Sequence, residues 1–458
     1  MHHKVERVHF IGIGGSGMSG IAEVLLNLGY RVSGSDLQES PVTERLRRLG
    51  AVIYRGHSRQ HVGEVQVVVR STAVKDDNPE VQAARERAIP VIPRAEMLAE
   101  LMRLKYGIAV AGTHGKTTTT SIIATILQDT SLDPTIVIGG RLNNLKSNAR
   151  LGQGEIMVVE ADESDGSFLA LSPIIAVITN IDREHLDHYQ GGLPEIEDTF
   201  VAFANKVPFY GLVVVCLDDP RVQEIIPRLG RRLCTYGFNP QADFRALDVR
   251  IEGMGSTFNL VVGGRPCGEI SLGLPGRHYV QNALAAIAVG FELGLDFAVI
   301  KRNLEQFGGV QRRLQVIGEY RGAVVVDDYG HHPTEVVATL TALRQAFPDR
   351  RLLVAFQPHR YSRTQHLFNE FLVAFNEADE LLVTEIYPAG EAPVAGVSGR
   401  QLADGIRQHG HKNVSFFPDR EAMVAFLREH LAADHVLLTL GAGNINQVGQ
   451  ALIDNTEG

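Results

Sequence analysis

The sequence has few cysteines, no long apolar run and no concentration of positive charge. Its three cysteines show neither C-x-x-C spacing nor the density of a disulfide framework, which argues against a zinc site and a disulfide scaffold. No stretch approaches the ~18 apolar residues of a membrane helix, and the N-terminus lacks the apolar core of a signal peptide. The net charge of −9 is spread along the chain and leaves no basic stripe. We therefore expect a cytoplasmic protein without a nucleic-acid or membrane partner.

The length and the order of predicted elements indicate several α/β domains. A chain of 458 residues with 44% hydrophobic and 21% charged residues can form two to four domains, each with its own core. Buried strands alternate with helices along almost the whole chain, which is typical of α/β folds. We place the domains at 1–104, 105–312 and 313–458, with a β-rich excursion over 243–276 inside the second.

The clearest motif is a glycine turn between a buried strand and a helix. An apolar run over 108–111 leads into Gly-Thr-His-Gly-Lys-Thr-Thr (112–118), and the helix is predicted to reach about Leu127. Such a turn binds phosphate: its backbone N–H groups and helix N-terminus attract the anion, Lys116 adds a full charge, and a hydroxyl can ligate Mg²⁺. The common eight-residue motif has its first glycine where this chain has Val110, so the loop is a compressed variant.

Acidic residues follow the next two predicted strands. The strand over 156–162 ends in Glu160, Asp162 and Glu163, and the strand over 174–181 is followed by acids and by His185 and His188. Carboxylates at the end of a strand beyond a phosphate loop are where Mg²⁺ is usually held. On spacing alone, a solvated acidic turn and a surface histidine pair remain the alternatives.

The N-terminal unit carries a second glycine motif. A strand over 8–13 leads into Gly12-x-Gly14-x-x-Gly17, followed by a helix over 18–28 and a strand over 31–36 that ends in an acid. This dinucleotide-binding motif is compatible with NAD, FAD or any nucleotide diphosphate, and it does not indicate which of them binds. Glycines that serve only the turn and the helix packing are the structural alternative. His57 and Ser71 lie where loops after strands are expected.

The third unit reads as a regular α/β alternation. We expect strands over 323–328, 351–356, 380–384, 414–417 and 436–440. Ligands gather beyond the carboxyl ends of strands in such sheets. Those ends carry Asp327-Asp-Tyr-Gly-His-His-Pro333, Gln357-Pro-His-Arg-Tyr-Ser-Arg363, Glu385 and Gly441-Ala-Gly-Asn444. A buried helix over 279–291 precedes this unit and has His278 and Asn282 near its start.

Four motifs together resemble the Mur ligases, the ATP-dependent amide-forming enzymes of peptidoglycan precursor synthesis. They are the loop at 112–118, Val159-Glu-Ala-Asp-Glu-Ser164, Asn180-Ile-Asp-Arg-Glu-His-Leu-Asp187 and Asp327-Asp-Tyr-Gly-His-His-Pro333. The resemblance runs from Val8 to Gly449. The segments Gly12–Ala22 and Pro358–Arg363 resemble the branch that joins L-alanine to UDP-N-acetylmuramate through an acyl phosphate, with release of ADP and phosphate.

The resemblance implies the site residues and the partners. For ATP it implies Gly112, Thr113, His114, Gly115, Lys116, Thr117, Thr118, His278, Asn282, Arg313 and Asp328. For the UDP-sugar it implies Gly14, Gly15, Ser16, Gly17, Met18, Ser35, Asp36, His57 and Ser71. For the amino acid it implies Tyr329, His331, His359, Arg360 and Arg363. Thr117 and Glu160 would hold Mg²⁺ and His185 would hold a second Mg²⁺. The catalytic groups would be Lys116, Arg313 and either His331 or His359. We expect a monomer or a homodimer.

Other readings of the sequence remain open. Several relatives carry a carbamylated lysine after the metal histidine, but this chain has no lysine there before Lys206, so none is assigned. The nearest rival function is a ligase that attaches a preformed peptide to the same UDP-sugar, and a folate polyglutamylating ligase is more distant. A nucleotide-dependent dehydrogenase would leave the loop at 112–118 unused, and a non-catalytic nucleotide switch would need no third domain rich in His and Arg.

Overall fold

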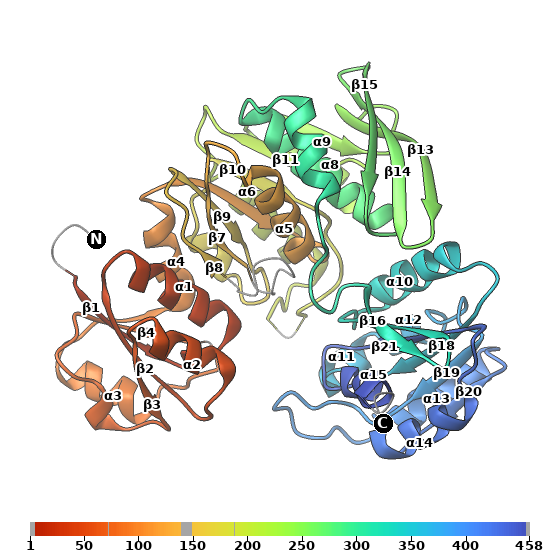
Figure 1. Cartoon of the computed structure of the whole chain (residues 1–458). Coiled ribbons are helices and arrows are strands. Elements are labelled where there is room, and N and C mark those ends of the chain that lie inside the picture. The colour runs from red at the N-terminus through yellow and green to blue at the C-terminus, as the bar shows by residue number, and fades with distance from the viewer. Residues whose placement is uncertain (1–4, 72, 139–148, 187, 455–458) are drawn as a thin grey trace. The chain divides into compact units, whose positions relative to one another are not determined.

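The computed structural model describes residues 5–71, 73–138, 149–186 and 188–454. By contacts, the chain divides into two units. The first comprises Met1–Ala246, Leu260–Cys267 and Gln281–Gly308, and the second comprises Leu247–Asn259, Gly268–Val280 and Gly309–Gly458. The elements are described sheet by sheet below (Figure 1). Among the described residues, no helix has the length and apolar character needed to cross a bilayer.

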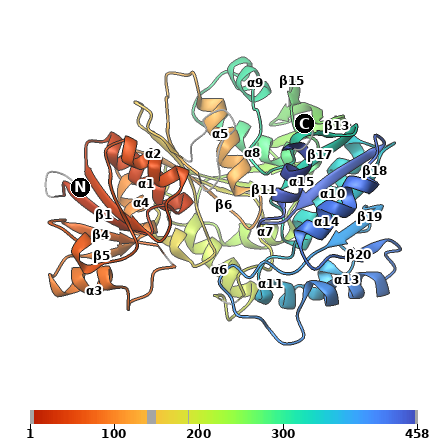
Figure 2. The same ribbon diagram turned by 60° about the horizontal axis from the view of Figure 1, so that its bottom comes forward.

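The first sheet is parallel and has five strands. In the order of the sheet, these are β3 (Val52–Arg55), β2 (Arg31–Asp36), β1 (Arg7–Ile11), β4 (Val67–Arg70) and β5 (Val91–Pro93). Its helical segments are α1 (Ser16–Asn27), α2 (Pro41–Arg48), the 3-10 turn η1 (Arg59–His61), α3 (Pro79–Glu86) and α4 (Arg94–Met102). Helices α1 and α2 lie on one side of this sheet and α3 lies on the other (Figure 2). Along β1, Val8 and Phe10 therefore belong to a different cluster from Ile11.

The second sheet has ten strands. Their order is β15 (Arg265–Leu272), β14 (Gly255–Val262), β13 (Phe244–Glu252), β12 (Leu233–Gly237), β11 (Leu212–Cys216), β10 (Ile175–Ile178), β6 (Tyr106–Ala111), β9 (Ile156–Glu160), β7 (Thr135–Val137) and β8 (Ala149–Arg150). The accompanying helical segments are α5 (Lys116–Leu127), η2 (Ser167–Ala170), α6 (Leu193–Ala204), α7 (Pro220–Ile225), η3 (Ile226–Arg228), α8 (Arg277–Glu292) and α9 (Phe297–Glu305). Strands β9, β6, β10 and β11 are parallel neighbours, so the loops after them meet at one edge.

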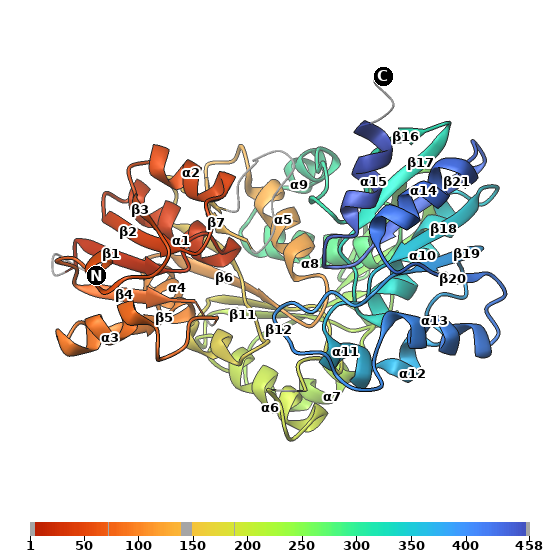
Figure 3. The same ribbon diagram turned by 90° about the horizontal axis from the view of Figure 1, so that it is seen from below.

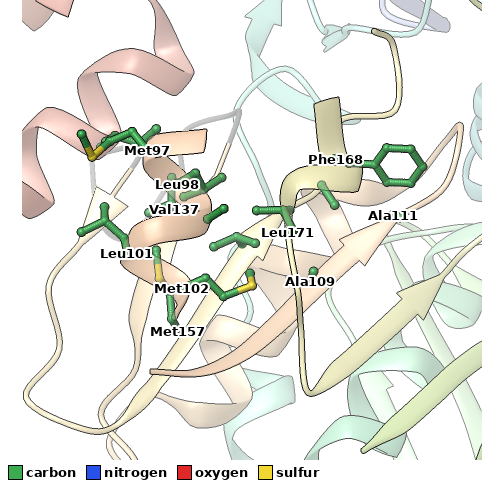
Figure 4. Close-up of a cluster of buried hydrophobic side chains, with 14 of the residues drawn as sticks. Met97, Leu98, Leu101, Met102, Ala109, Ala111, Val137, Met157, Phe168 and Leu171 are labelled. Carbon is green, nitrogen blue, oxygen red and sulfur yellow. The ribbon is translucent and has the colours of Figure 1, made fainter. Parts of the chain in front are cut away.

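Helix α4 joins the first sheet to the second by apolar packing. Its residues Met97, Leu98, Leu101 and Met102 are at most 3% exposed and belong to the same cluster as Met157 of β9 (Figure 4). Burying four large side chains stabilises this packing by several kcal/mol, at about 1.5–3 kcal/mol each. This contact explains why the first sheet falls into one unit with the part of the second sheet that contains β6 and β9.

The third sheet has six strands. Their order is β16 (Gln315–Tyr320), β17 (Ala323–Asp328), β21 (His435–Leu440), β18 (Arg351–Phe356), β19 (Glu380–Val383) and β20 (Val414–Phe416). Its helices are α10 (Pro333–Ala346), α11 (Tyr361–His366), α12 (Phe368–Phe371), α13 (Gly399–Gln408), α14 (Arg420–His430) and α15 (Asn446–Ile453). Helices α14 and α15 lie side by side and supply Met423, Leu427, Val448 and Leu452 to one core (Figure 3).

The predicted α/β class is confirmed, and the differences are local. The strands over 31–36, 323–328 and 351–356 have the predicted bounds. The first strand ends two residues earlier than predicted because Gly12 turns the chain with φ +80°. The antiparallel strand β16, which carries a register shift between Val316 and Gly318, was not predicted.

Candidate active site

The central glycine loop leaves β6 and enters α5 through two left-handed glycines. Gly112 has φ +131° and Gly115 has φ +81°. A Cβ on Gly112 would lie 2.0 Å from the Thr179 hydroxyl, and one on Gly115 would lie 2.7 Å from Oδ1 of Asn282. Both positions therefore require glycine, for conformation and for space. Asn282, predicted from the start of α8, lies against this loop.

Lys116 is the first residue of α5, and its ammonium is turned back over the loop. Its Nζ donates to the carbonyls of Gly112 (2.7 Å) and Thr113 (3.0 Å) and to the Glu163 carboxylate (2.9 Å). Burial alone would lower the pKa of Lys116, but Glu163 and the neighbouring acids raise that pKa above its ordinary value. The ammonium therefore stays charged. Glu163 was noted in the sequence as an acid, but its pairing with Lys116 was not predicted.

Thr117 and Glu160 lie together at the other side of the loop. The Thr117 hydroxyl donates to Oε1 of Glu160 at 2.9 Å, so two oxygen ligands from α5 and from the end of β9 are adjacent. Hard divalent cations prefer such oxygens, and the pair therefore fits a Mg²⁺ site. The third predicted ligand, His185, has φ +56°, and its Nε2 lies 4.0 Å from Oε1 of Glu163.

The segment after β10 holds the loop in place, a role that the sequence analysis did not assign. Asn180 accepts from His114 N at 2.8 Å and donates to His114 O at 3.0 Å. The Thr179 hydroxyl donates to the same carbonyl at 2.6 Å. Asp182 lies 3.0 Å from Nε2 of His114 and donates its N–H to the Thr113 hydroxyl. The available signal was the polar Thr-Asn-x-Asp sequence directly after an apolar strand.

The N-terminal glycine loop is held by the end of β2. The carboxylate of Asp36 accepts from Gly14 N at 2.8 Å, and the Ser35 carbonyl accepts from Gly12 N at 2.8 Å. A Cβ on Gly14 would lie 2.8 Å from Oδ2 of Asp36, and one on Gly17 would lie 2.6 Å from an Arg94 nitrogen. The loop therefore has no side chain at Gly14 and Gly17, where a diphosphate is expected, and the Arg94 guanidinium lies next to Gly17.

The remaining predicted UDP-sugar residues differ in where they point. Met18 is 2% exposed and belongs to the core, and Ser71 follows β4 with its hydroxyl accepting from Ala73 N. The side chain of Ser35 is fully buried and turned toward His57 and Glu80. Ser16 begins α1, but its side chain lies outside the described residues.

In the second unit, Arg313 lies beside the predicted adenine and ribose residues. The guanidinium of Arg313 lies 3.5 Å from Glu335 and over the Tyr329 ring. Burial, assisted by Arg313, lowers the pKa of His278 to about 4, so this imidazole is neutral. Asp328 is 3% exposed and accepts from the N–H groups of Leu314 and Gly330, both at 2.7 Å. Burial raises the pKa of Asp328 to about 6.

The predicted amino-acid residues gather after β17 and β18. The rings of His331 and His359 lie 5.8 Å apart, and Arg363 donates to Nδ1 of His359 at 3.1 Å. Arg360 precedes α11 with φ +68°, and its N–H donates to the Tyr387 carbonyl. The Tyr387 ring stacks on His359 at 5.5 Å. The sequence analysis named Glu385 in the same segment after β19 but missed Tyr387.

A phosphate loop with a charged lysine, and with a hydroxyl and a carboxylate side by side, defines a nucleotide-phosphate-binding α/β protein. The comparisons narrow this class. Three family models match in order: the Mur ligase family catalytic domain over residues 7–106, the Mur ligase middle domain over 110–290, and the Mur ligase glutamate ligase domain over 312–443. The chain belongs to the Mur ligase family.

Relatives extend over the whole chain. A UDP-N-acetylmuramate–L-alanine ligase of Geobacter sulfurreducens is 59% identical over 457 residues, which cover 100% of this chain and 99% of the relative. The ligase of the same name in Geotalea uraniireducens is 60% identical over 458 residues and 100% of both chains. The crystal structure of UDP-N-acetylmuramate–alanine ligase from Thermotoga maritima matches with a TM-score of 0.84 at 30% identity, over 98% of this chain and 99% of that one. A murein peptide ligase from Psychrobacter arcticus shares the fold, with a TM-score of 0.71 at 23% identity over 98% of each chain.

Proposed function

We propose that this protein joins L-alanine to the carboxylate of UDP-N-acetylmuramate, with ATP as the energy source, in the synthesis of peptidoglycan precursors. The observation that carries the choice of substrates is the 59–60% identity, over the full length, to relatives named for that reaction. The geometry around Lys116 supports the chemistry. These substrates are consistent with action in the cytoplasm.

The proposed reaction has two steps, because a carboxylate is a poor electrophile. The carboxylate oxygen first bonds to the γ-phosphorus of ATP while the bond to ADP breaks. The amine of L-alanine then attacks the carbonyl carbon of the acyl phosphate, the bond to phosphate breaks, and the amine loses a proton. Lys116 and Arg313 would spread the charge of the transferring phosphoryl group, which is the main contribution of a protein to such a transfer.

We expect one Mg²⁺ on Thr117 and Glu160, and a second Mg²⁺ with His185 as a ligand. The support for this is the adjacent pair of oxygens on Thr117 and Glu160 at 2.9 Å. When bound there, Mg²⁺ would neutralise charge on the phosphates of ATP. The protein's own contribution is to hold these oxygens beside Lys116 on the first turn of α5.

The hydrogen bonds of the two candidate bases favour His331. Nδ1 of His331 lies 3.0 Å from the Tyr329 carbonyl, an acceptor, so Nδ1 carries the hydrogen and Nε2 is the atom that can take a proton. His359 is bonded in the opposite way: Arg363 only donates, so Nδ1 of His359 accepts, and the hydrogen of the neutral ring is on Nε2. We therefore propose His331 as the base and His359 as an orienting group.

Release of phosphate from ATP tests the function. The protein is assayed with UDP-N-acetylmuramate and, in parallel, L-alanine, other single amino acids or a tripeptide. Release that requires both UDP-N-acetylmuramate and L-alanine is the expected result. Preference for the tripeptide would support the peptide-attaching ligase instead, and turnover that requires NAD would refute the proposal.

A further inference from the structure

A fully buried glutamate lies behind the UDP-sugar side of the first sheet. Glu80, in the first turn of α3, has a side chain that is 0% exposed. Its carboxylate lies 2.6 Å from the Ser35 hydroxyl, 2.8 Å from Nδ1 of His61, 3.0 Å from Ser58 N and 3.1 Å from Nε2 of His9. A buried polar group is rarely surrounded by four donors unless it is charged.

Glu80 is therefore an ionised acceptor. Burial by itself would raise the pKa of its carboxyl, but the hydrogen bonds from His9, Ser35 and Ser58 together lower that pKa to about 2. An ionised carboxylate only accepts hydrogen bonds. Each neighbour must therefore point a hydrogen at it, and this requirement fixes the orientation of Ser35.

Ser35 passes that constraint on to His57. A serine hydroxyl has one hydrogen, and here it is donated to Glu80. Nδ1 of His57 lies 3.0 Å from the same hydroxyl oxygen, which can then only accept from it. The hydrogen of a neutral His57 ring is thereby placed on Nδ1, and Nε2 keeps a lone pair.

The relay ends at the proposed UDP-sugar site. The Ser35 carbonyl accepts from the N–H groups of Gly12 and Ile13, at 2.8 and 3.0 Å, so the residue that orients His57 also holds the glycine loop. His57 follows β3, the neighbour of β2 in the parallel sheet, and its side chain is 17% exposed. Its ring therefore lies at the carboxyl ends of the strands, where ligands of such sheets bind.

We propose that Glu80 is a positioning residue of the UDP-sugar site. Acting through Ser35, it holds His57 with its hydrogen on Nδ1, so that Nε2 accepts a hydrogen bond from a hydroxyl or imide N–H group of the UDP moiety. This inference rests on the proposed function, which supplies the UDP-sugar.

Steady-state kinetics on the full chain tests the role in binding. We expect Glu80→Gln to raise the KM for UDP-N-acetylmuramate about tenfold, as for one lost hydrogen bond, with kcat and the KM for ATP unchanged. Glu86→Gln, an exposed glutamate on the same helix, is the matched control and should leave all three unchanged. An unchanged KM for the UDP-sugar in folded Glu80→Gln protein would overturn the proposal, and so would equal changes in the KM for UDP-sugar and ATP.

Ser35→Ala keeps the test decisive if Glu80→Gln does not fold. It removes the relay but leaves His9, His61 and Ser58 on the carboxylate. We expect the same rise in the KM for the UDP-sugar, and no further rise when Ser35→Ala is combined with His57→Gln. Additive losses in the double variant would show that Ser35 does not act through His57 and would refute the relay.

Nitrogen-15 NMR of the histidine rings tests the relay without substrate. The His57 signals, assigned by their loss in His57→Gln, should show a protonated Nδ1 and an unprotonated Nε2 in the wild type. This preference should weaken in Ser35→Ala, which leaves Nδ1 of His57 3.8 Å from Oε1 of Glu80. A wild-type His57 with its hydrogen on Nε2 refutes the relay even if the ligase reaction is observed. Conversely, absence of phosphate release with UDP-N-acetylmuramate and L-alanine would refute the proposed function while this spectrum is unchanged.

Discussion

The two glycine loops of the first unit share a backbone design but differ in charge. Both connect a buried parallel strand to a 12-residue helix, through Gly12 at φ +80° in one and through Gly112 at φ +131° in the other. The loop at Gly12 is held by an acid, Asp36, on Gly14 N. The loop at Gly112 carries Lys116 at its helix start. The backbone therefore suits phosphate in both cases. We propose that the ammonium of Lys116 fits the second loop to phosphoryl transfer and that the first loop only binds its substrate.

Each loop has a buried glutamate near it, and the two glutamates differ in pKa. Glu80 has hydrogen bonds from four donors, and those from His9, Ser35 and Ser58 lower its pKa to about 2. Glu163 is hydrogen-bonded to Lys116, and burial raises its pKa to about 7 although Lys116 acts in the opposite direction. A carboxylate surrounded by donors is a fixed structural charge. The charge of a carboxylate whose hydrogen-bonded ammonium is also expected to bind phosphate depends on where that ammonium lies.

The largest expected effect comes from removing the ammonium group of the second loop. Lys116→Ala should lower kcat for ADP formation by about 10³-fold or more, because charge on the transferring phosphoryl group loses its fixed ammonium. Binding of UDP-N-acetylmuramate, measured by calorimetry, should be nearly unchanged. Lys206→Ala, an exposed lysine of the same domain, is the control. Loss of both ADP formation and UDP-N-acetylmuramate binding in Lys116→Ala would contradict the division of roles between the loops.

Glu160→Gln should have the next largest effect. It replaces a carboxylate beside Thr117 with a weaker ligand, so we expect kcat to fall by about 10²-fold and the Mg²⁺ requirement to shift to higher concentration. A titration of activity against Mg²⁺ measures both. Glu155→Gln, at the exposed start of the same strand region, should behave like the wild type. An unchanged Mg²⁺ requirement in Glu160→Gln would argue against Glu160 as a ligand.

These first two predictions concern residues that the sequence could identify, because their motif is local. Lys116 and Thr117 are adjacent in the chain, and Glu160 ends the strand that pairs with β6. The Glu80 relay was not predicted, because Ser35 and Glu80 are 45 residues apart and only the folded sheet brings them together. Strand β16 was missed for a related reason: it is an edge strand without the continuous apolar run that marks the buried strand β17.

Acid should weaken the first domain through Glu80. Its folded pKa of about 2 lies below the ordinary value of 4.5, so its contribution is present above pH 4.5 and is lost as the pH falls toward 2. The difference corresponds to on the order of 3 kcal/mol of unfolding free energy. Urea unfolding at pH 7 and at pH 3 should show a smaller gap between wild type and Glu80→Gln at the lower pH. Glu86→Gln should have the same unfolding free energy as the wild type at both pH values. A difference between wild type and Glu80→Gln that does not change with pH would contradict the lowered pKa of Glu80.

The smallest expected effect tests whether the bare backbone of the first loop matters. Gly14→Ala places a methyl group 2.8 Å from Oδ2 of Asp36, so that carboxylate must move and its hydrogen bond to residue 14 weakens. We expect the KM for UDP-N-acetylmuramate to rise about tenfold, as for one lost hydrogen bond, and the KM for ATP to stay constant. Gly63→Ala, where the added methyl group meets nothing within 4 Å, is the matched control. A change in the KM for ATP alone in Gly14→Ala would contradict the roles given to the two loops. The loop without a lysine would then be the one that binds ATP, the nucleotide that donates the phosphoryl group.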